Sequence, residues 1–335
     1  MQIGTIYTLP TGVTPKGIAT THNKAYVVND NNYHIPDQAS VMVINLRDKS
    51  VLTTIYDKSF NEPYTINISG RRAYVTNSNS TTITIIDIKY DKVIGIIDGF
   101  DGPSGMVIKD NKIGYVNNYG GPNGVGSGNG TTISVVDLIN KVIIDTIEVD
   151  LAPASLAISP SGKYVYVINY VDGKPGTGTF NVIDTRSNNI IHTTTGLFGP
   201  FNIAITPNGA YAYITNFGSN DFAPFGNTVA IIDLSSYKIV NTIIVGIQPS
   251  GVAIDPRGKY AYVTNYNTLY AGPNFTKLTP GQGLVSIIDI EKQKVLPKTI
   301  VVNQSPANNA ITDDGHYLLV TNFVSNTVNI ISLNC

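Results

Sequence analysis

The chain has 335 residues, with 22 Lys and Arg against 23 Asp and Glu, so its formal net charge of −1 excludes a general attraction to nucleic acid or an anionic membrane. Charged residues make up only 13%, against a usual share of roughly 25%. Asn, Thr and Ser supply the polar surface instead, as in proteins found outside cells or on a particle surface. The abundance of Ile, Val, Thr and Tyr favours strands over helices.

The two ends of the sequence carry little targeting information. The opening MQIGTIYTLP lacks the basic and long apolar segments of a signal peptide, so the protein is kept inside the cell or its targeting segment is absent from this chain. No apolar run reaches 18 residues, so we expect no transmembrane segment. The single cysteine, Cys335, cannot form an internal disulfide. We expect an exposed thiol there, or a link between molecules.

The rest of the chain repeats one unit seven times. Each copy opens with a proline and continues as a short apolar strand, a turn, a strand close to YVTN, a loop, a strand close to IIDL, a polar turn and an Ile/Val-rich strand. Period-2 alternation between turn signals predicts strands throughout. Four antiparallel strands in about 40–50 residues are typical of a β-propeller blade. The copies open at Pro15, Pro63, Pro103, Pro153, Pro200, Pro249 and Pro306.

The seventh copy stops after three strands. Residues 3–12, IGTIYTLPTG, follow the pattern of the fourth strand in copy five, VNTIIVGIQP at 240–249. We therefore expect residues 1–9 to complete blade seven and close the ring with three strands from one end and one from the other. Closure protects the edges that an open sheet would expose. The prediction is one domain, residues 1–335, formed by a seven-bladed all-β propeller.

The repeated second strand carries a family resemblance. It runs AYVVN at 25–29, AYVTN at 73–77, YVNN at 115–118, AYITN at 212–216, AYVTN at 261–265 and LVTN at 319–322. With ITPNG or IDPRG before it and IIDL after it, this pattern resembles the YVTN family of seven-bladed β-propellers along the whole chain. That resemblance implies a relative of archaeal and bacterial surface-layer and secreted proteins. It does not define an activity, because propellers host many functions.

Two sets of repeated polar residues are interpreted as structural. An asparagine ends the second strand, where its amide can bond backbone groups that leave the strand. An aspartate ends the third strand, where its carboxylate can accept N–H groups of a tight turn. The asparagines are Asn29, Asn77, Asn118, Asn169, Asn216, Asn265 and Asn322, and the aspartates are Asp87, Asp137, Asp184, Asp233 and Asp289.

Loops of unequal length point to a binding face. The spacing from the motif asparagine to the end of the third strand is ten positions in copies two and seven, but fifteen to twenty-four in the other five. All of these insertions fall on one face of the propeller, which we call the top. Aromatic side chains beside Gly, Asn and Asp suit recognition of a protein or a sugar. The candidate binding residues are Tyr33, Tyr119, Tyr170, Phe217, Phe222, Phe225, Tyr266, Tyr270, Phe275, Asp172 and Asp221.

Two further observations bear on these candidates. Tyr119, Tyr170, Phe217 and Tyr266 each follow a motif asparagine, so packing at the blade tops is an equal alternative for these four. Of the 22 basic residues, 17 fall in the short turns of the opposite, bottom face, while acids outnumber bases in the top loops. An acidic top is poorly matched to nucleic-acid phosphates. We therefore expect a protein or glycan partner and no nucleic acid.

Signs of catalysis are sparse. No set of three His, Glu or Asp with metal-ligand spacing is visible, and we predict neither a metal nor a cofactor. The run GGPNGVGSGNG is not a P-loop, because it lacks GK[ST] and a following helix. We favour a non-catalytic binding or structural propeller, extracellular or surface-displayed. The alternative is a lactonase-like hydrolase at the top of the channel, with Glu62, Asp101, Asp30 and His34 as its candidate residues.

Overall fold

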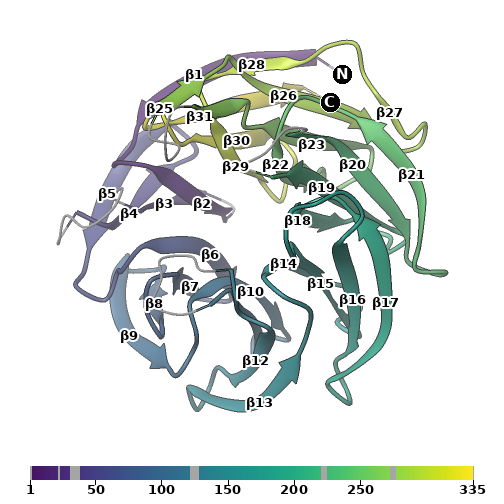
Figure 1. The fold of residues 1–335 in the computed structure, drawn as a ribbon. Helices are drawn as coiled ribbons and strands as arrows, with labels where there is room; N and C mark the ends of the chain where they lie inside the picture. Colours follow the sequence, from purple (N-terminus) through teal and green to yellow (C-terminus); the bar gives the residue numbers. More distant parts are fainter. Residues whose placement is uncertain are drawn as a thin grey trace.

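The structure of the protein, a computed structural model, describes residues 2–21, 23–30, 38–120, 128–219, 225–271 and 277–334. Every regular element within these ranges is a β-strand. The strands form seven sheets around a central channel and one separate two-stranded ribbon (Figure 1). The predicted all-β, seven-bladed propeller is therefore confirmed.

Each sheet is one blade, and its strands follow one another from the channel to the rim. Blade one contains β2 (Pro15–Thr20), β3 (Lys24–Asn29), β4 (Ser40–Asn45) and β5 (Ser50–Tyr56). Blade two contains β6 (Pro63–Ser69), β7 (Arg72–Asn77), β8 (Thr82–Asp87) and β9 (Lys92–Asp98). Blade three contains β10 (Pro103–Lys109), β11 (Ile113–Asn118), β12 (Thr132–Asp137) and β13 (Val142–Glu148). Blade four contains β14 (Pro153–Ile158), β15 (Tyr164–Asn169), β16 (Gly178–Asp184) and β17 (Asn189–Leu197).

The remaining blades keep this order with two variations. Blade five contains β18 (Pro200–Ile205), β19 (Tyr211–Gly218), β20 (Phe225–Asp233) and β21 (Lys238–Ile244). Blade six contains β22 (Pro249–Ile254), β23 (Tyr260–Asn265), β26 (Gly283–Asp289), β27 (Lys294–Val295) and β28 (Ile300–Val302). Its top loop carries the ribbon of β24 (Thr268–Ala271) and β25 (Lys277–Pro280). Blade seven contains β29 (Pro306–Ile311), β30 (Tyr317–Asn322), β31 (Thr327–Asn334) and β1 (Gln2–Pro10).

The outer strand of blade six is interrupted, which the repeat pattern did not predict. β27 and β28 both pair with β26, one at each end of it. Pro297 lies in the gap between them. Proline has no N–H to donate to a ladder and is tolerated in sheets mainly at edges, so the break falls on the outermost strand of this blade.

Blade seven closes the ring. β1 pairs antiparallel with β31, from Gln2 opposite Asn334 to Pro10 opposite Thr327, with a register shift between Ile3 and Ile6. The Nδ2 of Asn329 also donates to the Thr8 Oγ1 at 2.8 Å. The predicted three-plus-one closure is confirmed, and the two ends of the chain lie close together (Figure 1).

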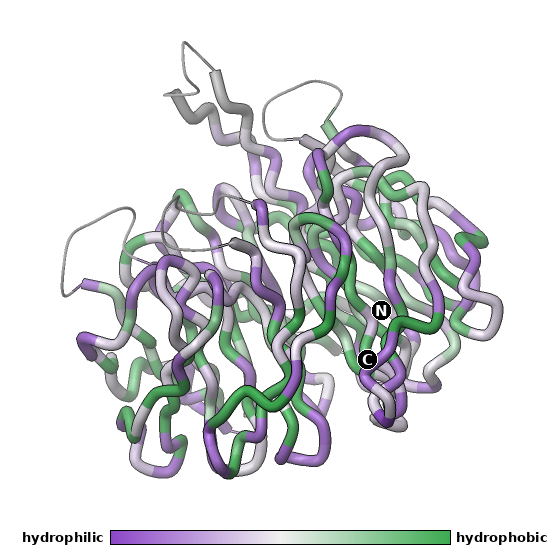
Figure 2. Tube along the Cα trace, turned by 60° about the horizontal axis from the view of Figure 1, so that its bottom comes forward, coloured by the Kyte–Doolittle hydropathy of each residue, from purple (hydrophilic) through white to green (hydrophobic). Residues whose placement is uncertain are grey.

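The core lies between the blades. The buried hydrophobic side chains of the described residues form seven clusters, each shared by two neighbouring blades. The cluster between blades seven and one, for example, joins Ile18, Val27 and Ile44 to Leu319 and Ile330. Hydrophobic stretches follow the strands, and hydrophilic stretches lie mostly in the turns (Figure 2). Since each blade is buried against two others, its stability depends on an intact ring.

The motif asparagines and aspartates have the structural roles expected of them. In blade two, the Asn77 Nδ2 donates to the Thr82 Oγ1 at 3.1 Å and the Thr84 Oγ1 at 3.0 Å, while its Oδ1 accepts the N–H of Asn61 at 3.2 Å. In blade five, the Asp233 Oδ1 accepts the N–H groups of Ser235 at 2.8 Å and Ser236 at 3.0 Å. The asparagine thus joins the incoming loop to two strands, and the aspartate closes the turn that follows the third strand.

The motif threonine supports a bulge at the inner end of the blade. Every inner strand shows a register shift just after its opening proline. In blade five, the Thr215 Oγ1 accepts the N–H of Asn202 at 2.9 Å, and in blade seven the Thr321 Oγ1 accepts that of Asn308 at 3.1 Å. A bulge redirects the side chains around it. The residue after the proline consequently lines the channel in every blade, and the next residue does so in six of the seven.

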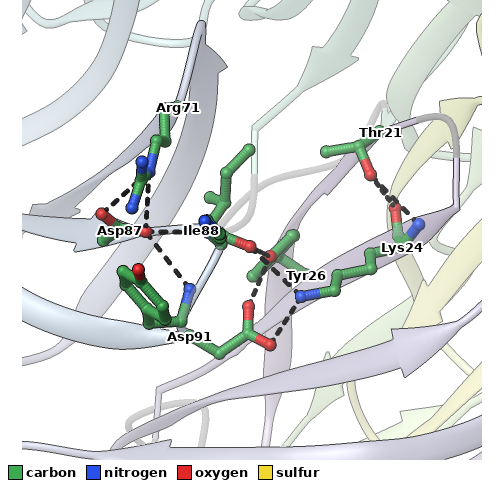
Figure 3. A network of polar contacts seen from close by, with 9 residues as sticks. Thr21, Lys24, Tyr26, Arg71, Asp87, Ile88 and Asp91 are labelled. Atoms are coloured by element: carbon green, nitrogen blue, oxygen red, sulfur yellow. Dashed lines mark hydrogen bonds and ion pairs between the residues drawn. The ribbon is translucent and has the colours of Figure 1, made fainter.

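The motif tyrosine can join one blade to the next at the bottom face (Figure 3). The Tyr26 Oη of blade one donates to the Asp91 Oδ1 of blade two at 2.6 Å. The Lys24 Nζ lies 2.6 Å from the other oxygen of the same carboxylate and donates to the Ile88 carbonyl at 3.1 Å. Burial, and next the neighbouring Asp91, raise the pKa of Tyr26 far above its ordinary value, so it remains a donor.

We predict that removing residues 1–9 destabilises the whole ring, because it leaves β31 with a bare edge and opens the contact between blades seven and one. The melting temperature should fall by more than about 10 °C, or the protein should aggregate. Differential scanning fluorimetry checks this. Removing residues 1–2 alone is the control and should change little. A nine-residue truncation that melts within a few degrees of the full chain would contradict the closure.

The repeat supplies a matched pair of tyrosine substitutions. Tyr213 holds the place of Tyr26 in blade five and is equally buried, but its Oη has no hydrogen-bond partner in the described part of the chain. Tyr26→Phe removes the bond to Asp91 and should lower the free energy of unfolding by about 1–2 kcal/mol, whereas Tyr213→Phe should be neutral or slightly stabilising. Denaturant titration of both variants measures the difference. Equal losses would show that the Asp91 contact contributes nothing.

Candidate functional site

The top face is defined by the pairing of each opening proline with a motif asparagine. Pro15 lies opposite Asn29, and Pro200 lies opposite Asn216. The loops after the second strand and the segments entering each blade therefore lie at the same end of the sheets. The short turns lie at the other end, which we call the bottom face.

The channel opens on the top face into a cavity of about 260 Å³. Its wall is made mainly by the residues that directly follow the opening prolines, which the bulges turn inward. These residues differ from blade to blade. In chain order they are Lys16, Tyr64, Ser104, Ala154, Phe201, Ser250 and Ala307.

One side of this cavity is a continuous row of rings, which we call the aromatic arc: Phe201, Phe217, Tyr266 and Phe323. The ring centroids of Phe201 and Phe217 are 5.1 Å apart, and those of Phe217 and Tyr266 are 6.1 Å apart. Tyr266 and Phe323 are separated by 6.1 Å as well. The rings are tilted against one another, as aromatic pairs prefer. The arc extends over blades five, six and seven.

The opposite side carries a tyrosine and an ion pair. The Lys16 Nζ lies 2.6 Å from the Asp30 Oδ2 and 4.9 Å from the centroid of the Tyr64 ring. Burial within the ring of blades, with smaller contributions from Tyr119 and Asp30, raises the pKa of Tyr64 well above its ordinary value. The Tyr64 hydroxyl therefore remains protonated at neutral pH. The charge of Lys16 is compensated, so this wall has no net charge.

Below the mouth the channel narrows to a space of about 160 Å³ with a more polar wall. Its lining includes Thr65, Asn67, Ser155, Asn202 and Asn308. Glycine is required at position 17, because a Cβ there would lie 2.7 Å from the Thr65 Cα and from the Tyr64 carbonyl oxygen. The missing side chain lets blades one and two approach each other beside the cavity.

The structure brings two of the predicted site residues together and places others apart. Phe217 and Tyr266 lie side by side in the aromatic arc. Tyr119 and Tyr170 are half-buried under their own loops, since a Cβ on Gly128 would lie 3.2 Å from the Tyr119 Oη and one on Gly173 only 2.4 Å from the Tyr170 Oη. These close approaches agree with the packing alternative, and Tyr119 also lies near enough to Tyr64 to contribute to the raised pKa of that hydroxyl.

The other candidates have separate surroundings. The Asp172 carboxylate accepts from the Lys174 ammonium at 2.7 Å and the Thr177 hydroxyl at 2.6 Å, and these two contacts hold the pKa of Asp172 far below its usual range. It therefore organises its own loop. Phe225 is half-buried at the start of β20, opposite Gly218. Tyr270 belongs to β24. Tyr33, Phe222, Phe275 and Asp221 lie outside the described residues.

Three aromatic residues of the mouth were missed by the sequence analysis. Phe323 follows the motif asparagine Asn322, just as Phe217 and Tyr266 follow theirs, so that signal was present. Tyr64 and Phe201 each follow an opening proline. Nothing in the sequence alone marks that position as part of a wall, because its direction depends on the bulge that the structure reveals.

The candidate residues for a hydrolase site have separate surroundings and do not form one cluster. Asp30 is paired with Lys16, whereas the Glu62 Oε1 lies 3.4 Å from the Asn79 Nδ2, and the Asp101 side chain is exposed. His34 lies outside the described residues. Within the described ranges no group of three His, Cys, Asp or Glu is placed to hold a metal ion. None of the described segments is a helix long and apolar enough to cross a membrane.

Taken with the ring of blades, this geometry defines a seven-bladed β-propeller whose channel mouth is an aromatic-walled cavity. Hydrazine synthase from Kuenenia stuttgartiensis has a similar structure, with a TM-score of 0.78, 20% identity and 96% of each chain covered. Over 57 residues the chain is 40% identical to the PE-PGRS family protein PE_PGRS18 of Mycobacterium tuberculosis. That match covers 17% of this chain and 12% of the relative. No protein-family model matches the sequence.

The ion pair at the mouth should be structurally important. Lys16→Met leaves the buried Asp30 without its cation and should lower the free energy of unfolding by about 2 kcal/mol. A fully buried ion pair would lose more, but the Lys16 side chain is 22% exposed to solvent. Adding Asp30→Asn should restore part of the loss. Lys174→Met, at the exposed Asp172 pair, is the control and should have no measurable effect. Denaturant titration of all three tests the assignment; a neutral Lys16→Met would contradict it.

Proposed function

We propose that this propeller is a non-catalytic binding or structural module of the YVTN-repeat type, secreted or displayed on a surface, which recognises a protein or a carbohydrate through its top face. The observation that carries the proposal is the aromatic-walled cavity at the channel mouth, on the same face as the five long loops. Concave, largely apolar sites with a few polar groups are where propellers and other folds bind ligands.

The repeated residues and the variable residues of the blades have different roles, and this difference supports the proposal. Repeated residues such as Asn77, Asp233 and Thr215 are engaged in hydrogen bonds that form the blade itself. The positions that differ between blades are the ones that face the cavity, from Lys16 and Tyr64 to Phe201. If all seven blades presented the same residue to the cavity, a bound ligand would have seven equivalent orientations. An aromatic side opposite the Lys16–Asp30 ion pair can instead hold a ligand in one orientation.

The ribbon of blade six adds a second element to the top face. Its base is anchored, because the Thr268 N–H donates to the buried Gln248 Oε1 at 3.0 Å and the Thr268 Oγ1 lies 2.5 Å from the Ser305 Oγ. The Asn267 carbonyl also accepts the N–H of Gly281 at 2.8 Å. A ribbon held at its base to blades six and seven, beside the aromatic arc, is suited to contact a partner larger than the cavity.

This proposal predicts that shortening the ribbon weakens partner binding and spares the fold. Residues 269–279 are replaced by Asn-Gly, which joins Thr268 to Pro280 by a tight turn and retains Tyr266 and the anchoring contacts of Thr268. The melting temperature should change by only a few degrees, since loop length has little weight in stability. Binding should be measured on a broad glycan array and with surface extracts of the source cells.

Bottom-face substitutions provide the control. Arg71→Ala and Lys89→Ala change exposed basic residues near the ring of Tyr90. They should leave binding unchanged. If these variants abolish binding while the ribbon-shortened protein binds normally, the top face is the wrong assignment.

A further inference from the structure

We infer that the cavity at the channel mouth is a subsite for one neutral hexopyranose ring, stacked on the aromatic arc at the end or at a branch of a glycan. This inference rests on the proposed binding function and narrows it to one ligand class and one location. It follows from the size of the cavity, the order of its walls, its unpaired polar groups and its charge.

The size admits one ring and little more. The cavity holds about 260 Å³, which is below the roughly 300–1,000 Å³ of pockets for drug-sized ligands. The narrower space beneath it holds about 160 Å³. A single six-membered ring with its substituents fits the mouth, while the rest of a larger ligand must lie outside on the top face.

The two sides of the cavity match the two kinds of surface on a pyranose. Such a ring has a face of C–H groups and an edge of hydroxyl groups. The aromatic arc lines the cavity with four rings, of which Phe217 and Tyr266 are buried and Phe201 and Phe323 are half-buried, so the last two present more of the apolar surface. Stacking a C–H face on this wall removes apolar surface from water on both partners.

The hydroxyl edge also finds partners. The Asn202 amide makes no side-chain hydrogen bond within the described chain, and neither does the Ser155 hydroxyl. The Asn308 Oδ1 accepts the N–H of Asn309, which leaves the Asn308 Nδ2 able to donate. All three residues line the mouth next to the apolar wall. These groups distinguish a sugar from an aliphatic side chain of a protein partner, which would remove them from water without replacing their hydrogen bonds.

The charge of the mouth favours a neutral ring. Among the described residues that line the mouth, Lys16 alone is charged, and its ammonium is compensated by Asp30 at 2.6 Å. A carboxylate on the sugar would have to compete with Asp30 for this cation and would face the excess of acids in the top loops. A uronic or sialic acid should therefore bind less well than a neutral hexose.

The test uses saturation-transfer difference NMR on the full chain. The probes are methyl glycosides of glucose, galactose, mannose and N-acetylglucosamine, with methyl glucuronide as the acidic comparison. We expect at least one neutral glycoside to bind, with the strongest saturation on the C–H groups of one ring face. The glucuronide should give the weaker signal.

Two substitutions taken from the repeat itself locate the ring. Phe201→Ala introduces the residue that blades four and seven carry at this position, Ala154 and Ala307, and Asn202→Ser introduces the residue of blade four, Ser155. Each should weaken binding of the neutral glycoside about tenfold or more, with an unchanged melting temperature. Tyr90→Ala, at an exposed tyrosine of the bottom face, is the control and should bind as the parent does.

The outcomes separate this inference from the function on which it rests. If a glycan or protein partner binds and is lost on shortening the ribbon, but Phe201→Ala and Asn202→Ser bind it normally, the sugar subsite is wrong and the binding function remains. Preference for the glucuronide, or failure of all neutral glycosides while a protein partner is still captured, overturns the subsite in the same way. If no glycan or protein binds to the folded chain, both proposals fail.

Discussion

The antiparallel pairing of β1 with β31 is the interaction on which the rest of the molecule depends. It joins residue 2 to residue 334 and converts a row of seven blades into a ring. Further contacts reinforce the same seam, since the Asn326 Oδ1 accepts the N–H of Thr14 at 2.8 Å and the Thr321 Oγ1 donates to the Lys16 carbonyl at 2.8 Å. The inter-blade clusters depend on this closed ring. The cavity that the inner strands enclose depends on it as well.

A closed ring also explains how repeated strands can form nearly identical blades and still enclose a cavity with unlike sides. Where the second strand carries them, the tyrosine, threonine and asparagine can contact the next blade, the bulge of the inner strand and the third strand, as Tyr26, Thr215 and Asn77 do. Such contacts help to give the blades similar backbone shapes. The residues after the opening proline can then differ from blade to blade, and together they line the cavity at the channel mouth.

This arrangement accounts for what could be predicted from the sequence. The strand order, the seven blades and the completion of blade seven by the N-terminal strand follow from local patterns and a repeat that is visible along the chain. The break in the outer strand of blade six could have been anticipated from Pro297. Phe323 carried a signal, because it follows a motif asparagine, but Tyr64 and Phe201 did not, since they enter the mouth only through the bulges and the closure of the ring. Long aromatic-rich loops drew attention to Tyr119 and Tyr170, whose hydroxyls lie close to glycines of their own loops.

The register of the closing strands has a mechanical consequence. Because Gln2 lies opposite Asn334 at one end of the ladder, a force that pulls these two residues apart loads its hydrogen bonds one after another, as in opening a zipper, and never all at once in shear. The seam is therefore weaker under tension that separates these two residues than it would be under shear along the two strands.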